Sequence, residues 1–513
     1  MTTAAAPPTT PDAPPDAHDA HEAHEAHEAH EARDARDARD APGARVGDGL
    51  AARLARMKEA QRKNGAPTYE ERIETLDKLE RALIRRKAGI ADAISRDFGN
   101  RSKHETIVSE IFVVVGAIKH TKAHLKEWME VEEREVGWVF LPASLEVRPQ
   151  PLGVVGIISP WNYPIQLALS PLVQVLAAGN RAMIKPSELV PETAELLRDL
   201  VAETFPDDQV TVITGGADVG EEFSHLPFDH MVFTGSTRVG KLVMKAASEN
   251  LVPLTLELGG KSPTIVGGDF NPKTAAERIL AGKLFNAGQT CIAPDYVLVP
   301  AGTRDAFVEA CKAAVAKMYP TLEKNPDYTS IVNERHHQRL SGLVQDAKTR
   351  GARVVELNPA NETIDPAASR KLVPTLVLDP TDEMLVMQEE IFGPVLPVKT
   401  YQTLDEAIAY VNEHPRPLAL YFFSHDRAAT DRVLNETVSG GVTLNETLLH
   451  VAQDDVPFGG IGPSGMGHYH AKEGFDSFTK KKPVFRQARL NTTGLLRPPY
   501  GKTVDRLLKF LTG

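Results

Sequence analysis

Residues 153–185 read GVVGIISPWNYPIQLALSPLVQVLAAGNRAMIK: an apolar run, a polar turn, a helix-length segment and a second apolar run. The first run, Gly153–Ile158, is continuously apolar, which is typical of a strand buried on both faces. The pattern over Ile165–Ala178 predicts a helix that ends at Gly179-Asn180. Strand, helix and strand in this order predict a βαβ unit and therefore a parallel sheet.

The same alternation continues as far as residue 258. Expected strands cover 182–185, 210–213, 230–233 and 254–258, and expected helices cover 191–205 and 237–250. Strands separated by helices of this length indicate an α/β fold with a doubly wound parallel sheet, an architecture that binds nucleotides.

Helices are also expected ahead of this sheet. Amphipathic patterns predict helices over 50–65, 70–98 and about 102–130. Thr68 followed by Glu71 matches a capping box at the start of the second helix. The apolar face of that helix is expected to consist of Ile73, Leu76, Leu79, Leu83 and Ile84.

Ligands of doubly wound sheets bind beyond the carboxyl ends of the strands. The residues at those ends are 159–162, 185–188, 215–216, 234–236 and Glu257. Singly, Lys185 reads equally well as a surface lysine and Glu257 as a solvated carboxylate, but their joint placement predicts one site. Gly235–Gly240 marks a strand-to-helix turn whose N–H groups would attract phosphate. Because the middle glycine of the standard dinucleotide fingerprint is absent, we expect a looser pyrophosphate contact.

The two cysteines differ in their surroundings. Cys291 lies in Phe285–Tyr296, FNAGQTCIAPDY, among small, turn-forming residues that would present its thiol. A lone cysteine is otherwise most often a small buried hydrophobe, so both interpretations stay open on local sequence alone. Cys311 falls on the apolar face of a helix expected over 304–319, which predicts a core residue.

Length and composition narrow the class of protein. A chain of 513 residues is too long for one hydrophobic core, so two large domains are expected. The net charge of −11 suggests no nucleic-acid partner, and Lys480–Lys482 reads as a solvated turn. Two cysteines suit a reducing compartment, and no apolar run reaches the roughly 18 residues of a membrane span. These features predict a cytoplasmic protein without a membrane span.

The first 46 residues form a low-complexity tail. A three-residue unit places histidines at His18, His21, His24, His27 and His30. Such a tract lacks the apolar content of a core, so a solvated, disordered tail is the preferred interpretation. A transient helix that binds a transition metal with one histidine stripe is the alternative. We predict no metal site in the rest of the chain.

Six separated motifs resemble the NAD(P)-dependent aldehyde dehydrogenases, over residues 50 to 490 or so. They are Pro160–Pro164, Lys185–Glu188, Thr255–Pro263, Gly288–Cys291, Glu389–Pro394 and Pro457–Gly460. Cys291–Tyr296 and Pro457–Tyr469 are most similar to the class 3 branch, and Thr493–Gly501 resembles its bacterial coniferyl aldehyde dehydrogenases.

The resemblance implies roles for individual residues. It implies Cys291 as the nucleophile, Glu257 as the general base and Asn162 as an oxyanion donor. It places Lys185 and Glu188 at the adenosine ribose, Gly235 and Ser236 near the pyrophosphate, and Glu390 and Phe392 around the nicotinamide ribose. The cofactor is expected to be NAD, with NADP use left open, because the Glu188 carboxylate would repel a 2′-phosphate that Lys185 could accept. Asn445 and the glycines of 458–465 resemble family positions near the pocket, although a tight turn without chemistry explains them as well.

The resemblance also implies a division of the chain and a homodimer. The cofactor domain would cover 47–257 with an oligomerisation ribbon at 138–153, the catalytic domain 258–441, and a returning segment 442–513 with a strand near 480–491. A short amphipathic C-terminal helix over 503–511 is expected to dock on the protein.

The expected activity is oxidation of an aldehyde, aromatic such as coniferyl aldehyde or medium-chain aliphatic, to the acid through a cysteine thioester. A CoA-acylating aldehyde dehydrogenase and a non-catalytic binding protein on this fold are the alternatives.

Overall fold

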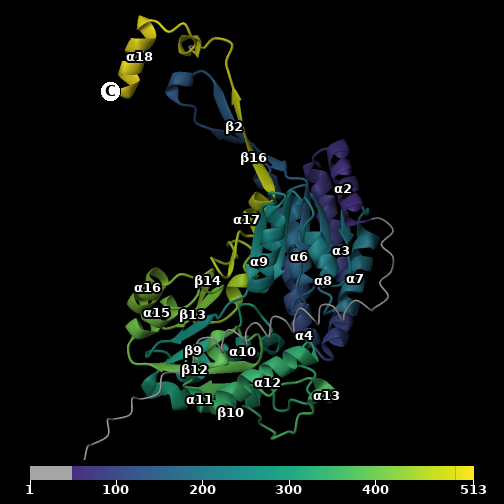
Figure 1. Cartoon of the computed structure of the whole chain (residues 1–513), viewed down its shortest axis with the longest axis vertical. Helices are drawn as coiled ribbons and strands as arrows, with labels where there is room; N and C mark the ends of the chain where they lie inside the picture. The colour runs from purple at the N-terminus through teal and green to yellow at the C-terminus, as the bar shows by residue number, and fades with distance from the viewer. Residues whose placement is uncertain (1–48, 492) are drawn as a thin grey trace, which may run out of the picture.

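Three β-sheets organise the chain in the computed structural model, which describes residues 49–491 and 493–513. Two sheets lie in the two large lobes of Figure 1, and the third forms an arm that projects from them. The tail predicted for residues 1–46, with its histidine tract, lies outside the described residues.

The six-stranded sheet has the order β15-β7-β6-β3-β4-β5. Its strands are β3 (Val154–Ile158), β4 (Arg181–Lys185), β5 (Val210–Val212), β6 (His230–Gly235), β7 (Leu254–Leu258) and β15 (Gly465–Met466). The first five run parallel, and β15 joins β7 in the antiparallel sense. Four helices connect them: α6 (Gln166–Ala177), α7 (Pro191–Thr204), α8 (Ala217–Ser224) and α9 (Thr237–Ser248). The predicted doubly wound sheet is confirmed.

Burial explains these elements. β3 is apolar throughout, β4 is apolar between Arg181 and Lys185, both strands are covered on both faces, and every residue of α6 is buried. The sequence pattern does not predict α8, because its eight residues bury just one apolar side chain, Phe223.

The N-terminal helices lie on both faces of this sheet: residues 50–57 pack on the face that α8 and α9 cover, and the helices after residue 68 pack on the face that α6 and α7 cover. They are α2 (Leu50–Asn64), α3 (Tyr69–Phe98), α4 (Lys103–Thr106), the π-helical turn η2 (Ile107–Phe112) and α5 (Val113–Trp128). The capping box is confirmed, since Thr68 and Glu71 exchange both hydrogen bonds. The apolar face of α3 is confirmed at Leu76, Leu79 and Leu83, but Ile84 was wrongly included and is 45% exposed.

The second large sheet has seven strands in the order β10-β11-β12-β9-β8-β13-β14. They are β8 (Pro263–Val266), β9 (Tyr296–Pro300), β10 (Arg353–Glu356), β11 (Thr375–Leu378), β12 (Val395–Tyr401), β13 (Ala419–Phe423) and β14 (Gly441–Leu444). All its pairs are parallel except β10 with β11. Its helices are α10 (Pro272–Leu284), α11 (Arg304–Met318), α12 (Glu334–Thr349), α13 (Pro366–Ser369), α14 (Leu385–Gln388), α15 (Leu404–Asn412) and α16 (Arg427–Glu436). β9 continues the chain directly from the Cys291 loop.

The arm is a three-stranded antiparallel sheet of β1 (Glu132–Arg134), β2 (Ser144–Pro151) and β16 (Thr479–Arg486). The predicted ribbon is confirmed over Ser144–Gln150, whereas residues 138–140 form a 3₁₀ turn. Lys480–Lys482 is exposed as expected, but it lies in β16, so the predicted turn is wrong.

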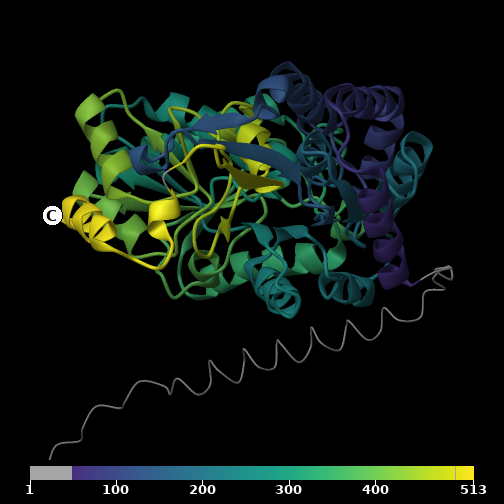
Figure 2. The same cartoon turned by 90° about the horizontal axis from the view of Figure 1, so that it is seen from above.

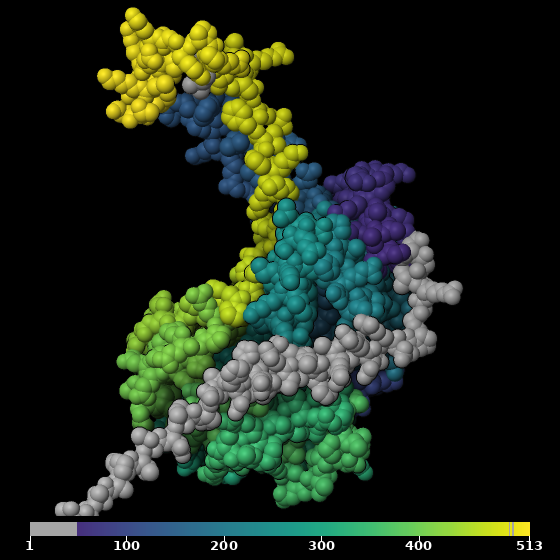
Figure 3. All heavy atoms as spheres, viewed as in Figure 1, coloured from purple at the N-terminus to yellow at the C-terminus, as the bar shows by residue number. Residues whose placement is uncertain are grey.

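The C-terminal helix α18 (Lys502–Thr512) lies at the far end of the arm, beyond α17 (Ala471–Ser477) and β16 (Figures 1 and 3). Viewed from above, the yellow C-terminal helix and the purple N-terminal helices lie at opposite sides of the molecule (Figure 2). Val504 is the one buried side chain of α18, and Phe510 is 76% exposed. The expected docking of this helix on its own subunit is therefore wrong.

Candidate active site

The Cys291 loop leaves α10 through a left-handed turn. Asn286, Ala287 and Gly288 have φ angles of 53°, 51° and 76°. A side chain at Gly288 would place its Cβ 2.3 Å from the carbonyl oxygen of Gly393, so glycine is required at this close approach. The buried Gln289 side chain ties the turn down by donating to the carbonyl oxygens of Asn286 (3.0 Å) and Ser330 (3.1 Å). The loop is thus held firmly on both sides of the turn.

Cys291 lies half-buried in the lining of a cavity of about 230 Å³. Burial raises the pKa of its thiol to about 12, and the carboxylates of Glu390 and Glu257 add to the shift. The sequence left Cys291 open between a buried hydrophobe and a presented thiol, and its place in a cavity wall favours presentation. Cys311 differs, since it is fully buried on α11 in a cluster with Phe307 and Val315, which confirms the predicted core residue.

Glu257 lies near the end of β7 and lines the same cavity. Strand β15 pairs Gly465 opposite it. Both carboxylate oxygens are buried and accept no hydrogen bond from the described part of the chain. Burial without a partner raises the pKa of Glu257 well above its usual range, as expected for a carboxylate held away from water.

Asn162 follows β3 and reaches the Cys291 loop. Its side-chain Nδ2 donates to the carbonyl oxygen of Gln289 at 3.2 Å, and the side chain of Asn286 donates to the Asn162 carbonyl oxygen at 3.1 Å. The hydroxyl oxygens of Tyr163 and Thr290 are 2.5 Å apart. These hydrogen bonds join the segment that carries Asn162 to the loop that carries Cys291.

The cofactor residues expected from the sequence fall into two groups. Gly235 and Ser236 lie at the end of β6, where the Ser236 hydroxyl caps α9 by accepting from the N–H of Val239 at 3.4 Å, and both line the cavity. Glu390 and Phe392 line it from the other lobe. Lys185 and Glu188 lie outside its lining, at the end of β4, where the buried ammonium is 3.5 Å from the Glu188 carboxylate.

The segment that carries Glu390 and Phe392 is joined to the Cys291 loop. Asp295 accepts a hydrogen bond from the N–H of Ile391 at 2.9 Å and forms an ion pair with Lys261. Burial, with the nearby charge of Asp295, raises the pKa of Glu390 to about 8. Asp295 thus ties the Cys291 loop to the segment that carries Glu390 and Phe392.

Trp161, His336 and Arg339 also line the cavity, and the sequence assigned a role to none of them. The Trp161 ring is 5.0 Å from the His336 ring and 5.3 Å from the Phe392 ring. Burial and the cations Arg339 and Arg335 lower the pKa of His336 to about 4, so this imidazole is neutral at physiological pH. His336 and Arg339 are three residues apart on α12, so they share one face of that helix. This spacing is too common in helices to have predicted a site.

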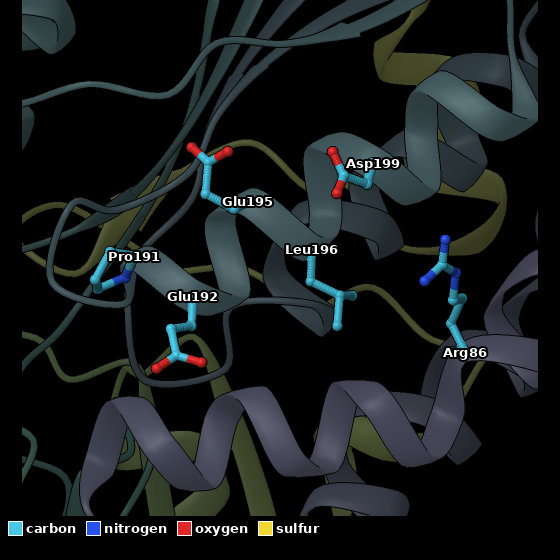
Figure 4. Close-up of a pocket in the computed structure, with 6 residues that line it drawn as sticks. All are labelled: Arg86, Pro191, Glu192, Glu195, Leu196 and Asp199. Carbon is cyan, nitrogen blue, oxygen red and sulfur yellow. The ribbon is translucent and has the colours of Figure 1, made fainter. Parts of the chain in front are cut away.

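A second hollow lies between α3 and α7 and is lined by Arg86, Pro191, Glu192, Glu195, Leu196 and Asp199 (Figure 4). None of the residues predicted for the site lies in it. In the described ranges, no group of three or more metal-ligating side chains could hold an ion, and no helix is long and apolar enough to cross a membrane.

Comparison with known proteins adds a family to this geometry. The family model described as "Aldehyde dehydrogenase family" matches residues 44–484. A "Probable coniferyl aldehyde dehydrogenase" of Caulobacter vibrioides is 51% identical over 89% of this chain and 95% of its own. A "Coniferyl aldehyde dehydrogenase" of Pseudomonas sp. is 49% identical over 91% and 98%. The solved structure of a substrate-bound Staphylococcus aureus AldH superposes with a TM-score of 0.85 at 41% identity, covering 90% of this chain and all of that one.

Proposed function

Because this chain belongs to the aldehyde dehydrogenase family, we propose that Cys291 is the nucleophile, Glu257 the general base and Asn162 an oxyanion donor. The chain is an NAD(P)-dependent enzyme that oxidises aldehydes to acids. One observation carries the assignment of roles. The three side chains line a single cavity together with Glu390, Phe392, Gly235 and Ser236.

The first step is the addition of sulfur to the aldehyde carbon. The thiol of Cys291, whose pKa burial raises, loses its proton to solvent as the sulfur attacks. The carbonyl oxygen then becomes an oxyanion, which needs donors where charge develops. The Asn162 amide and the N–H of Cys291 supply them. An amide suits this position because a carboxylate would repel both the thiolate and the oxyanion.

Collapse of this intermediate expels a hydride and leaves a thioester on Cys291. When bound, the nicotinamide cofactor supplies the hydride acceptor. The residues present fit such a group: Gly235 and Ser236 offer N–H groups at a helix start, and Glu390 and Phe392 form the opposite wall. Lys185 and Glu188 would hold the adenosine ribose.

The second half of the reaction is hydrolysis of the thioester. Water attacks the acyl carbon, Glu257 accepts a proton from it, and the acid leaves as the thiol is restored. A raised pKa brings a buried carboxylate closer to the working pH of a base. CoA-dependent acyl transfer needs no such base, so the retained Glu257 favours hydrolysis. The same set of three residues argues against a non-catalytic protein.

We assign an aromatic aldehyde of the coniferyl type as the substrate. The support is the printed name of the relatives that are about half identical to this chain over nearly their full length. Medium-chain aliphatic aldehydes are the second class to test. NAD is the expected cofactor, because the Glu188 carboxylate disfavours the 2′-phosphate of NADP.

A homodimer is the proposed assembly, with residues 138–153 and 480–491 as its arm. Exposed apolar side chains on the arm support it, since Trp138 is 64% and Phe485 49% exposed in the single subunit. The proposed domains remain 47–257, 258–441 and a returning 442–513. A cytoplasmic location is supported by the two free thiols.

The deciding experiment measures reduced cofactor by absorbance with a panel of aromatic and aliphatic aldehydes, each with NAD and with NADP. We expect the highest kcat/KM for coniferyl aldehyde with NAD. A clear preference for short aliphatic aldehydes would contradict the substrate assignment, and the need for added CoA would replace hydrolysis by acyl transfer. Sedimentation of the same sample tests the dimer, and fractionation of cells tests the location.

A further inference from the structure

Arg101 is a buried arginine that bonds directly to the backbone of Asn162. Its side chain is 0% exposed, and Nη1 donates to the Asn162 carbonyl oxygen at 2.7 Å. The guanidinium also lies 4.9 Å from the centre of the Tyr163 ring. It therefore contacts two consecutive residues of the segment that carries the proposed oxyanion donor.

Glu110 holds Arg101 in this position and also anchors the next element. One carboxylate oxygen accepts from Arg101 Nη1 at 3.0 Å, and the other accepts from the N–H groups of Ile165 (2.9 Å) and Gln166 (2.8 Å). These N–H groups begin α6, whose N-terminus no side chain of its own caps. Residues 162–166 are thus held at one end by Arg101 and at the other by Glu110.

The same carbonyl oxygen connects to the Cys291 loop. Asn162 O accepts from Arg101 and from the side chain of Asn286, a residue in the left-handed turn that leads to Cys291. Glu105, on the short helix between Arg101 and Glu110, accepts from the N–H of Asn286 at 3.1 Å. One N-terminal segment therefore supports both the amide and the loop that carries the thiol.

We propose that Arg101, oriented by Glu110, is a positioning residue that sets the Asn162 amide at the reacting oxygen. The inference rests on the proposed role of Asn162. A fully buried ion pair is weak evidence for a stabilising role, because desolvation offsets much of its attraction and apolar residues can replace it. The Arg101–Glu110 pair can affect catalysis because Arg101 bonds to the backbone of Asn162. Catalytic groups need placement within fractions of an ångström.

The experiment is a double-mutant cycle of Arg101→Met and Asn162→Ala, read as the rate of the first turnover of reduced cofactor. Arg101→Met alone is expected to slow this step by about 10- to 100-fold. In the Asn162→Ala enzyme, the same change should slow it less than about threefold further, because the amide that Arg101 positions is gone. Arg101→Lys, which keeps one charged donor, should recover part of the rate.

Arg72 provides the matched control. It is also buried, at 6% exposed, and donates to the carbonyl oxygen of Ala177 at 2.8 Å, near the other end of α6. Arg72→Met should also lower the melting temperature but leave the first-turnover rate within about twofold. Quenching of tryptophan fluorescence by NAD in each variant reports whether the cavity, which Trp161 lines, is intact.

The outcomes separate the inference from the proposed function. A loss of the same factor in the wild-type and Asn162→Ala backgrounds overturns the inference while leaving the role of Asn162 in place. An equal loss of rate in Arg72→Met overturns it too, because a general loss of structure then accounts for the effect. Full activity of Asn162→Ala would remove the role of Asn162 and the inference with it. If Arg101→Met does not fold, the Arg101→Lys cycle with Asn162→Ala decides by the same comparison.

Discussion

The side-chain amide of Asn162 donates a hydrogen bond of 3.2 Å to the carbonyl oxygen of Gln289, across 127 positions of sequence. Gln289 lies two residues before Cys291, so this bond joins the end of β3 to the Cys291 loop. An amide nitrogen carries two hydrogens, and one of them is used here. We propose that the second hydrogen is donated to the substrate oxygen. The bond to Gln289 then fixes the orientation of the Asn162 amide.

Replacing Cys291 by Ala should abolish dehydrogenase activity, because no thioester can form. We expect a loss of at least about 1,000-fold in kcat, measured by reduced-cofactor absorbance. Cys311→Ala is the control: it should keep kcat and lower the free energy of unfolding by about 1 kcal/mol, since it removes a buried sulfur. Full activity in Cys291→Ala would show that another group is the nucleophile.

Glu257→Gln should separate the two halves of the reaction. The variant keeps the size of the side chain but cannot accept a proton from water, so the thioester should accumulate. Rapid mixing should show a burst of about one reduced cofactor per active site, followed by a steady state about 100- to 10,000-fold slower than in the wild type. An unchanged steady-state rate would mean that a different base activates water.

Glu188 is predicted to control the choice of cofactor. Glu188→Gln removes the charge that would repel a 2′-phosphate and leaves the Lys185 ammonium, now without its partner at 3.5 Å, to attract it. The ratio of kcat/KM for NADP to that for NAD should rise by about tenfold or more. Glu195→Gln, a change in the separate hollow on α7, should leave the ratio unaltered. An unaltered ratio in Glu188→Gln would place the ribose elsewhere.

Glu105 should make stability depend on pH. Burial raises its pKa from 4.5 to about 7 against the opposing charge of Arg101, so the folded protein binds this proton more tightly than the unfolded chain. Its contribution to stability is therefore present below pH 4.5 and is lost as the pH rises through about 7. Glu105→Gln removes this contribution, worth about 3 kcal/mol at most.

Melting temperatures of both proteins at pH 5 and pH 8 test this sign. Relative to the wild type, Glu105→Gln should gain in melting temperature as the pH rises. Glu203→Gln, which changes an exposed carboxylate paired with Arg86, should show no such pH-dependent difference. A relative loss on going to pH 8 would mean that ionised Glu105 is the form that the fold prefers.

The α/β fold was predictable because its signals are local. The continuous apolar run of β3 and the capping box at Thr68 report burial and backbone bonding within a few residues. Ile84 and α18 were misjudged for the complementary reason. An apolar face on a helix shows that a surface exists to be covered, but it does not show whether this subunit covers it.

The candidate site divides in the same way. The types of Cys291, Glu257 and Asn162, with the motifs around them, were visible in the chain, and so was the family. The sequence did not show that Lys185 and Glu188 lie outside the cavity, or that His336 and Arg339 line it. It also did not show that Arg101 bonds to Asn162. Each of these depends on contacts between segments far apart in sequence.

The sequence by itself determined the alternation of strands and helices in the first large sheet, the strand ends at which ligands are expected, and the residue types to which we assign the oxidation of an aldehyde. Periodicity and turn chemistry act over a few positions, so they can be read from the chain. Only the tertiary structure decided which carboxylates are left without a partner, which thiol faces a cavity, and which arginine bonds to Asn162. Desolvation and hydrogen-bond geometry arise when distant segments pack together, and they have no local signature.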